Sequence, residues 1–296
     1  MSLQNRYEFV LLFDVQDGNP NGDPDAGNLP RVDAETNNGL VTDVCLKRKV
    51  RNYVQVTQDS SQGYDIFVKT KAILNDGIDK AYLAVGLDPE KAKKANNDKK
   101  NKFSPERRAE IMKAQTFMCK NFFDIRTFGA VLSTGANAGQ VRGPIQMTFA
   151  RSIDPVLTSE HAITRVAVTN EDDARSKETE MGRKFTLPYA LYREQGFVNP
   201  FFADQTGFSE TDLEVFWDAL VKMFDIDRSA ARGLMATRKL IIFKHSSRLG
   251  NAPAHILFDA VKVVRKSGIE FPRKFADYEV TIDRSALPSG VEVIEK

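Results

Sequence analysis

The chain has 296 residues, of which 42% are hydrophobic, and its 42 Lys and Arg against 40 Asp and Glu give a net charge of +2. This composition predicts a globular protein of one large or two small domains, and the near-neutral charge excludes a uniformly basic or acidic binding protein. The two cysteines, Cys45 and Cys119, have no metal or disulfide spacing, and the N-terminus has no apolar targeting segment. We therefore expect a soluble cytoplasmic protein with no membrane partner.

A strand, a polar loop and a basic helix follow one another at the start of the chain. The aromatic and aliphatic run Tyr7–Phe13 predicts a buried strand. The loop after it contains too many glycines and prolines for a regular element, and Thr42 or Asp43 is a suitable N-cap for the next helix. That helix has one apolar face and one basic flank, the flank consisting of Lys47, Arg48 and Arg51.

The next segment predicts short elements and a lysine-rich connection. We expect a strand at Ile66–Val68 and a helix at Asp79–Leu87. Residues 88–104 are interpreted as a lysine-rich, mobile loop rather than a nucleic-acid contact, because no aromatic residue or glycine orders the basic run. Ser104 and Pro105 then predict the start of a helix, as a cap followed by proline at the first helical position.

Residues 126–153 contain no acidic residue. Four glycines in this stretch allow the backbone to approach a ligand closely, and Arg126, Arg142 and Arg151 supply positive charge. The pattern is typical of an anion-binding loop. Residues 161–186 are polar and of mixed charge, which indicates an excursion from the core.

The second half of the chain alternates strands with one strong helix. Strands are predicted at Leu187–Val198, Lys239–Phe243, His255–Val264 and Tyr278–Asp283. A capping box at Ser209 begins an amphipathic helix whose aromatic stripe we assign to the core. The element order predicts an α+β fold in a single domain over residues 1–296, with the ferredoxin-like split βαβ as its simplest version, a topology shared by RNA-recognition modules.

No catalytic or metal constellation emerges from the sequence. Asp17–Asp23 has the oxygen spacing of a calcium loop, but Asn28 stands where a bidentate Glu is required. Asp23, Asp25 and Asp33 remain candidates for metal-dependent phosphodiester cleavage. His245 is either a general base or a phosphate donor, and no cofactor is expected. Basic clusters beside glycine- or serine-rich loops favour binding of a nucleic-acid backbone without sequence readout.

Several motifs together resemble the backbone subunit of the type I-C CRISPR surveillance complex, Cascade, of the RAMP superfamily. They are Asn19–Pro24, Pro30–Arg31, Gly39–Tyr53, Phe128–Val131, Gly139–Gln146 and Arg151–Pro155. The resemblance extends over nearly the whole chain. The lysine-rich segment is not part of it.

The resemblance implies an RRM-type palm with an inserted thumb at 161–186, and head-to-tail copies along a guide RNA that pairs with target DNA. Other implied partners are the guide 5′-end processing and capping subunit and the large and small subunits. The thumb displaces a guide base, with Met181 or Phe185 as the wedge. The expected RNA-binding residues are Asn21, Arg31, Lys47, Arg48, Arg51, Gln140, Arg142, Arg151, Arg165, Arg183, Lys184, Lys244 and Arg248.

Two other hypotheses stay open at this point. Related backbone subunits of type III complexes cleave target RNA with a loop aspartate, so a metal-dependent ribonuclease using Asp23, Asp25 or Asp33 is the alternative. A monomeric RNA chaperone is the third possibility. Cleavage of complementary RNA with magnesium indicates the ribonuclease, and a monomer with RNA bound indicates the chaperone. A large RNA-rich assembly without cleavage indicates the backbone subunit.

Overall fold

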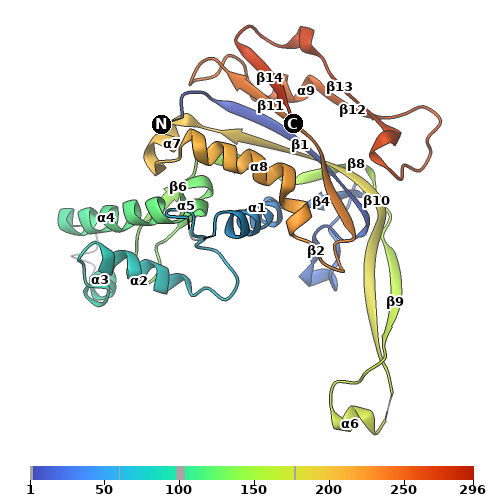
Figure 1. Ribbon diagram of the computed structural model, residues 1–296, viewed down its shortest axis with the longest axis horizontal. Helices are drawn as coiled ribbons and strands as arrows, with labels where there is room; N and C mark the ends of the chain where they lie inside the picture. The colour runs from blue at the N-terminus through green and yellow to red at the C-terminus, as the bar shows by residue number, and fades with distance from the viewer. Residues whose placement is uncertain (1–2, 60, 98–103, 177) are drawn as a thin grey trace.

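A single antiparallel sheet organises the molecule. The computed structural model describes residues 3–59, 61–97, 104–176 and 178–296 (Figure 1). β7 (Ile145–Met147) and β9 (Ser159–Arg165) pair with β10 outside the main order of the sheet. That order is β14 (Val291–Glu295), β11 (Leu234–His245), β1 (Tyr7–Gly18), β10 (Glu180–Val198), β8 (Ala150–Pro155) and β4 (Asn38–Val41).

The connectivity is that of a split βαβ fold. Along the chain the central elements are β1, α1 (Asp43–Thr57), β8, β10, α8 (Glu210–Ile226) and β11. This strand–helix–strand–strand–helix–strand sequence places the four strands side by side as β11-β1-β10-β8. The predicted α+β, RRM-like palm is confirmed.

Helices α1 and α8 cover one face of this sheet. Thr42 caps α1 by accepting a hydrogen bond from the Cys45 amide, and Ser209 and Asp212 form the predicted capping box of α8. Their apolar faces pack on alternate residues of β1. The buried set includes Phe9, Leu11, Phe13, Leu46, Val50, Phe216, Trp217 and Leu220, so the aromatic stripe belongs to the core as expected.

A C-terminal lobe covers the opposite face. Val10 and Leu12 of β1 and Tyr189 and Leu191 of β10 point into its separate core. Because β1 is buried on both faces, its sequence is a continuous apolar run rather than an alternating one. The lobe consists of α9 (Ala254–Asp259), β12 (Val261–Arg265), the 3₁₀ turns η2 (Phe275–Asp277) and η3 (Arg284–Ala286), and β13 (Tyr278–Ile282).

A helical subdomain lies beside α1 and has its own core (Figure 1). It contains α2 (Leu74–Ala84), α3 (Pro89–Asn97), α4 (Pro105–Asn121), α5 (Phe123–Phe128), and the ribbon of β5 (Gly129–Val131) and β6 (Gln140–Arg142). Three small elements lie in the loop after β1, namely β2 (Gly22–Asp23), η1 (Pro24–Ala26) and β3 (Leu29–Pro30), and α7 (Pro200–Thr206) follows β10.

Several sequence predictions are wrong in this region and in the lobe. Residues 66–68 form no strand, because their backbone is held by the Asp124 carboxylate instead. The loop predicted at 88–104 is helical over Pro89–Asn97, and residues 98–103 lie outside the described residues. The strand predicted from His255 starts only at Val261, after α9, and β14 follows the strand that was expected to be last.

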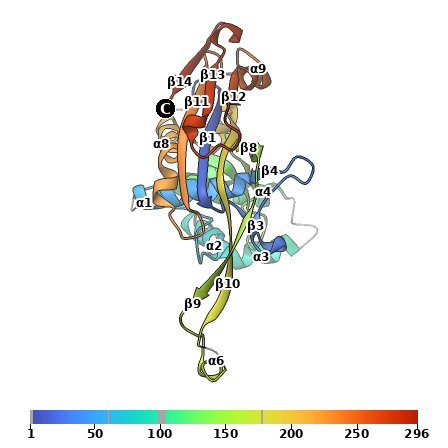
Figure 2. The same cartoon turned by 90° about the vertical axis from the view of Figure 1, so that its right-hand side faces the viewer.

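A long β-hairpin projects from the sheet at one end (Figures 1 and 2). The outer part of β10 pairs with β9, from Thr186 opposite Ser159 to Glu180 opposite Arg165. The short helix α6 (Glu171–Ala174) lies at its tip. The predicted excursion over 161–186 corresponds to this hairpin. No helix in the described ranges is long and apolar enough to span a bilayer.

Gly196 provides a test of the packing of β10. A Cβ atom at Gly196 would lie 2.1 Å from the Phe9 ring, which is fixed against Phe216 and Trp217. We expect Gly196→Ala to lower the free energy of unfolding by about 1–3 kcal/mol, measured by urea denaturation. Gly182→Ala is the matched control, because the nearest atom to its Cβ is Ile163 Cγ1 at 3.4 Å. An unchanged midpoint for Gly196→Ala would contradict this packing.

Candidate nucleic-acid interface

The basic side chains on the flank of α1 differ in whether they form an ion pair with an acidic residue. Arg48 is exposed and forms no ion pair with the described residues. Lys47 forms an i,i+4 ion pair with Asp43 at 2.8 Å and lies 5.6 Å from the centroid of the Phe128 ring. Arg48 is therefore the cation on this flank that is available to a ligand.

Arg51 joins α1 to the helical subdomain. Its Nε donates to Asp124 at 2.8 Å, and its guanidinium lies 5.4 Å from the Phe128 ring centroid. Asp124 is 1% exposed and also accepts the amides of Phe67 and Val68 at 2.9 and 3.1 Å. Arg51, predicted on the basic flank of α1 as an RNA contact, is therefore held by a buried carboxylate.

Two further cations of the same region are structural. Lys49 is buried, pairs with Asp227 and lies 5.6 Å from the centroid of the Phe224 ring, which ties α1 to α8. Arg126, predicted to add positive charge to the acid-free stretch, is buried and donates to Asp212 at 2.7 Å. Sequence spacing gives no signal for these pairs, since their partners lie far away in the chain.

The loop after β1 is stabilised by its own polar side chains. Asn21 Oδ1 accepts the amide and the hydroxyl of Thr42, both at 2.9 Å, so Asn21 fixes the start of α1. Arg31 lies 3.3 Å from Asp23. Asp33 accepts from Arg151 at 2.6 Å and from the backbone of Glu35 at 3.0 Å. The hydrogen bond from Arg151 is the main cause of the lowered pKa of Asp33.

Two of the three carboxylates proposed for metal-dependent cleavage are therefore already paired with cations. Asp23 and Asp33 are each in an ion pair with an arginine, and Asp23 also caps η1. Among the residues that the structure describes, no three His, Cys, Asp or Glu side chains converge as a metal site.

The acid-free stretch forms the β5–β6 ribbon. Gln140 and Arg142 are exposed on β6, and the Arg142 guanidinium lies 4.4 Å from the Phe202 ring centroid. Gly129 has φ +80°, and a Cβ on Gly143 would lie 2.4 Å from the Gly129 amide. These two glycines allow the two backbone segments to approach each other. The glycines of this stretch were expected to allow approach to a ligand instead. Because Gly129 pairs with Arg142 directly after Phe128, Arg142 lies near the α1 flank.

The hairpin carries a second group of predicted residues. Arg165 donates to Ala167 O and Thr169 Oγ1, and Arg183 pairs with Glu160 at 3.0 Å across the two strands. Lys184 forms no ion pair within the described ranges. Met181 is 75% exposed, whereas Phe185 is partly buried. Of the two wedge candidates, Met181 offers the freer side chain.

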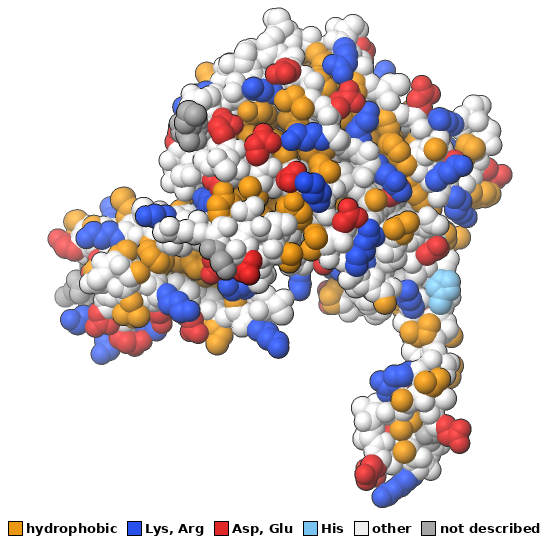
Figure 3. All heavy atoms as spheres, in the orientation of Figure 1, with side chains coloured by type: hydrophobic (Ala, Val, Ile, Leu, Met, Phe, Trp, Pro, Cys, Tyr) orange, Lys and Arg blue, Asp and Glu red, His pale blue; other side chains and the backbone are white. Residues whose placement is uncertain are grey.

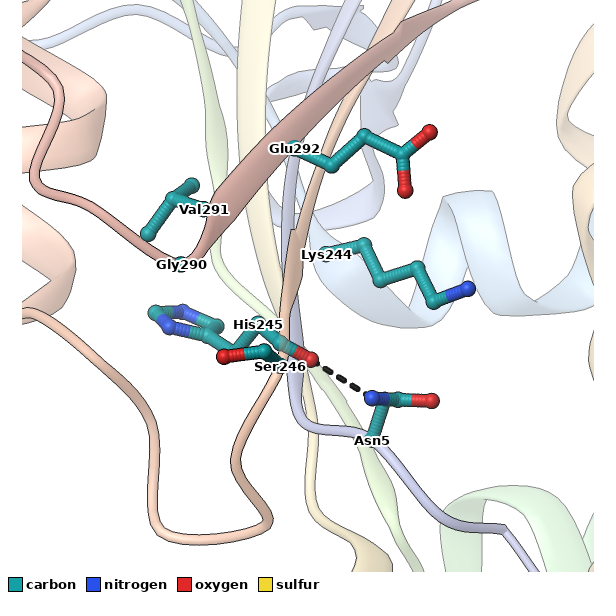
Figure 4. A pocket seen from close by; sticks show the side chains of 7 residues that line it. All are labelled: Asn5, Lys244, His245, Ser246, Gly290, Val291 and Glu292. Atoms are coloured by element: carbon teal, nitrogen blue, oxygen red, sulfur yellow. Dashed lines mark hydrogen bonds between the residues drawn. The ribbon is translucent and has the colours of Figure 1, made fainter.

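Lys244, His245 and Arg248 lie at the opposite end of the sheet from the hairpin. Lys244 and Val198 both pair with Tyr7, while the hairpin leaves near Gly18. In Figure 4 the Lys244 ammonium and the His245 ring point in opposite directions from β11. Arg248 is held by Asp204 and lies 5.0 Å from the Phe201 ring centroid.

His245 is a structural residue. It is fully buried, its Nδ1 accepts the Asn251 amide at 2.7 Å, and its Nε2 lies 2.5 Å from Glu8 Oε2. Since the Asn251 amide must donate, the proton of the neutral ring is on Nε2 and points to Glu8. The interpretation of His245 as a general base or phosphate donor is wrong, because both ring nitrogens are occupied.

Glu194 is an additional titratable group beneath the α1 flank. It lies on the helix-facing side of β10, is fully buried and forms no ion pair with the described residues. Burial is the main cause that raises its pKa well above 4.5, and a hydrogen bond from the Thr148 backbone and the nearby Lys47 charge oppose this shift only in part. The folded protein therefore retains this proton at higher pH than the unfolded chain does.

The position of Arg51 predicts a sharp difference between neighbouring charge reversals. Arg51→Glu should lower the free energy of unfolding by about 3–5 kcal/mol, because it leaves Asp124 buried beside a like charge. Arg48→Glu should change it by less than about 0.5 kcal/mol, because Arg48 is exposed. Urea denaturation of both variants measures the difference. Equal stability of the two variants would show that the pair with Asp124 is unimportant.

Glu194 predicts a pH dependence of stability. Its raised pKa means that stability falls as pH rises above about 4.5, where the unfolded carboxyl ionises and the buried one does not. Glu194→Gln should remove this loss, so the variant should gain stability over wild type at pH 8 relative to pH 5. Glu90→Gln, at an exposed carboxylate, is the control. A parallel pH profile of wild type and Glu194→Gln would refute the assignment.

Comparison with known proteins identifies the family. A family model described as CRISPR-associated protein Cas7 matches residues 5–283. The CRISPR-associated protein Cas7 of Haloferax volcanii is 28% identical over 244 residues, covering 74% of this chain and 65%, just under two thirds, of that protein.

Among solved structures, one with a TM-score above 0.5 shows the same fold. A chain of a CRISPR RNA-guided surveillance complex in a pre-nicking state has a TM-score of 0.51 and 15% identity, over 80% of this chain and 78% of its own. A chain of another CRISPR RNA-guided surveillance complex aligns with a TM-score of 0.43 and 16% identity, over 79% and 68%. Since the family model spans nearly the whole sequence, this chain belongs to the CRISPR-associated protein Cas7 family.

Proposed function

We propose that this chain is the non-catalytic, guide-RNA-binding backbone subunit of a type I-C CRISPR Cascade in the cytoplasm. The observation that carries the proposal is membership of the Cas7 family. The RRM-like palm, from which a β-hairpin projects, is consistent with that role. Copies would associate head to tail along the guide, since a heterologous contact that does not close generates an open helical array.

The free cations support a backbone grip on RNA. The predicted cationic contacts that form no ion pair in the described part of the chain and are at least partly exposed are Arg48, Arg142, Arg165, Lys184 and Lys244. Of these, Arg165 is engaged in hydrogen bonds within the hairpin, and Lys244 lies at the other end of the sheet. Cations of this kind hold phosphates without reading sequence, which leaves the bases of the guide to pair with target DNA. Other predicted contacts form ion pairs with acidic residues, so their charge is partly neutralised and we treat them as secondary contacts. These include Lys47, Arg51, Arg151, Arg183 and Arg248.

The hairpin is the proposed thumb, and Met181 is its preferred wedge. An exposed, flexible and apolar side chain is suited to insertion between bases. The other partners of the proposal are the guide 5′-end processing and capping subunit and the large and small subunits. The alternative ribonuclease has less support, because the carboxylates of Asp23 and Asp33 are each in an ion pair with an arginine.

Purification with and without a guide transcript tests the proposal. Wild type with guide should give a large particle with a high 260/280 nm absorbance ratio. Arg48→Glu with Arg142→Glu should lose RNA, and each lost contact should reduce the slope of log affinity against log salt by about one. Lys113→Glu with Lys120→Glu, on the exposed side of α4, is the charge-matched control.

Two outcomes would contradict this proposal. Wild-type RNA content in the Arg48 and Arg142 double variant would refute the palm contacts. Magnesium-dependent cleavage of complementary RNA that is lost in Asp33→Ala would favour the ribonuclease instead.

A further inference from the structure

A groove opens on the face of the sheet opposite α1, where the hairpin leaves the palm. It has a volume of about 530 Å³ and lies between the ends of β8 and β10 and the loop that joins β12 to β13. Figure 1 shows this loop beside the base of the hairpin. None of the predicted contacts on α1 lines this groove, so it is separate from them.

The floor of the groove is aromatic and its polar groups are already satisfied. The Tyr189 and Tyr278 rings lie 6.5 Å apart. The Tyr189 hydroxyl donates to Asp14 at 2.9 Å and the Tyr278 hydroxyl donates to Asp154 at 2.7 Å. The two rings are thereby fixed, and they offer apolar surface rather than hydrogen bonds to an occupant.

Phe271 at the rim has an unused aromatic surface. It is 68% exposed although phenylalanine is normally buried, and it makes no ring contact among the described residues. An exposed aromatic ring at the edge of an aromatic-floored groove is suited to stacking on a flat apolar partner.

The loop that carries Phe271 is strongly basic. Residues 265–274 contain four cations, Arg265, Lys266, Arg273 and Lys274, and one acid, Glu270. The Asp277 carboxylate accepts the backbone amides of Arg273 and Lys274 at 2.8 and 3.2 Å, so it opposes part of this charge. Arg265 lies 3.8 Å from Asp154, but Lys266, Arg273 and Lys274 form no ion pair with any described residue. Basic side chains gather over the region of β12 and β13 at the right of Figure 3. These charges would attract an anion to the groove.

We propose that this groove binds an unpaired nucleotide of single-stranded nucleic acid, with its base on Phe271 and its phosphate at Arg273 and Lys274. Stacking on an exposed ring combined with unpaired cations is the mode in which single strands are bound without sequence preference. Pockets for small ligands span about 300–1,000 Å³, so the groove is large enough for one nucleotide. An acidic protein segment would neutralise the cations but would leave the Phe271 ring without a flat partner.

This site goes beyond guide binding on the palm, and it is a second contact on the other face of the sheet. The α1 flank packs with the helix-side core, whereas Tyr189 and Tyr278 belong to the core of the C-terminal lobe. A strand held there is either a displaced part of the same nucleic acid or a second strand. Both share the chemistry of an unpaired base with its phosphate.

Binding of fluorescein-labelled oligo(dT)₂₀ and oligo(U)₂₀ to the guide-loaded protein tests the proposal by fluorescence anisotropy. Phe271→Ala should weaken binding about 5- to 150-fold, as expected for loss of one stacked base. Phe271→Trp should retain it. Arg273→Glu with Lys274→Glu should weaken binding and reduce the salt slope by about one to two. An equal loss of affinity for both oligomers indicates that the groove binds either DNA or RNA. A larger loss for one oligomer identifies that kind of strand as the occupant.

Guide content is measured in every variant, so that the two proposals are tested separately. Unchanged oligonucleotide binding by Phe271→Ala with the guide retained would overturn the groove while leaving the proposed function intact. Wild type that never acquires a guide would refute the proposed function, and the Phe271 comparison would then be made on the guide-free chain. A 5-iodouracil oligonucleotide should cross-link to Phe271. Loss of self-association in Phe271→Ala without any cross-link would identify a protein interface and overturn the proposal.

Discussion

The continuous backbone of β10 is the constraint on which the molecule depends. Its inner half pairs with β1 and β8 in the sheet, and its outer half pairs with β9 in the hairpin. Every strand that leaves a sheet must satisfy its amides and carbonyls elsewhere, and here β9 supplies them. The hairpin is therefore a continuous extension of the sheet, because one strand belongs to both, and Tyr189 and Tyr192 anchor the inner half of that strand in the cores on the two faces.

Buried ion pairs hold the layers on the helix side together. Arg51 with Asp124, Arg126 with Asp212 and Lys49 with Asp227 connect α1, α5 and α8 across large sequence separations. Removing one partner of such a pair leaves an uncompensated charge in the interior, which is strongly destabilising. For this reason the basic residues of the palm fall into two kinds, and only the exposed ones are suitable for testing RNA binding by charge reversal.

The sheet separates two surfaces with different chemistry. The α1 flank and β6 present scattered cations on an RRM-like palm, whereas the base of the hairpin combines cations with an exposed phenylalanine and an aromatic floor. The groove is lined by β10 itself, at Tyr189 and Leu191, so it lies at the point where the hairpin leaves the sheet.

The sequence by itself determined the elements with local signals. Caps at Thr42, Ser104 and Ser209, the apolar run of β1 and the aromatic stripe of α8 depend on neighbouring residues, so they were predicted correctly. The family resemblance, which implies the palm, was also present in local motifs, and the α+β topology followed from element order. Only the tertiary structure decided which cations are free and what the glycines do. The partners of Arg51 and His245 come from strands and helices 73 and 237 residues away, and chain-local patterns carry no information on such pairings. The aromatic groove at the base of the hairpin was undetectable for the same reason, since β8, β10 and the β12–β13 loop meet there only after the chain has folded.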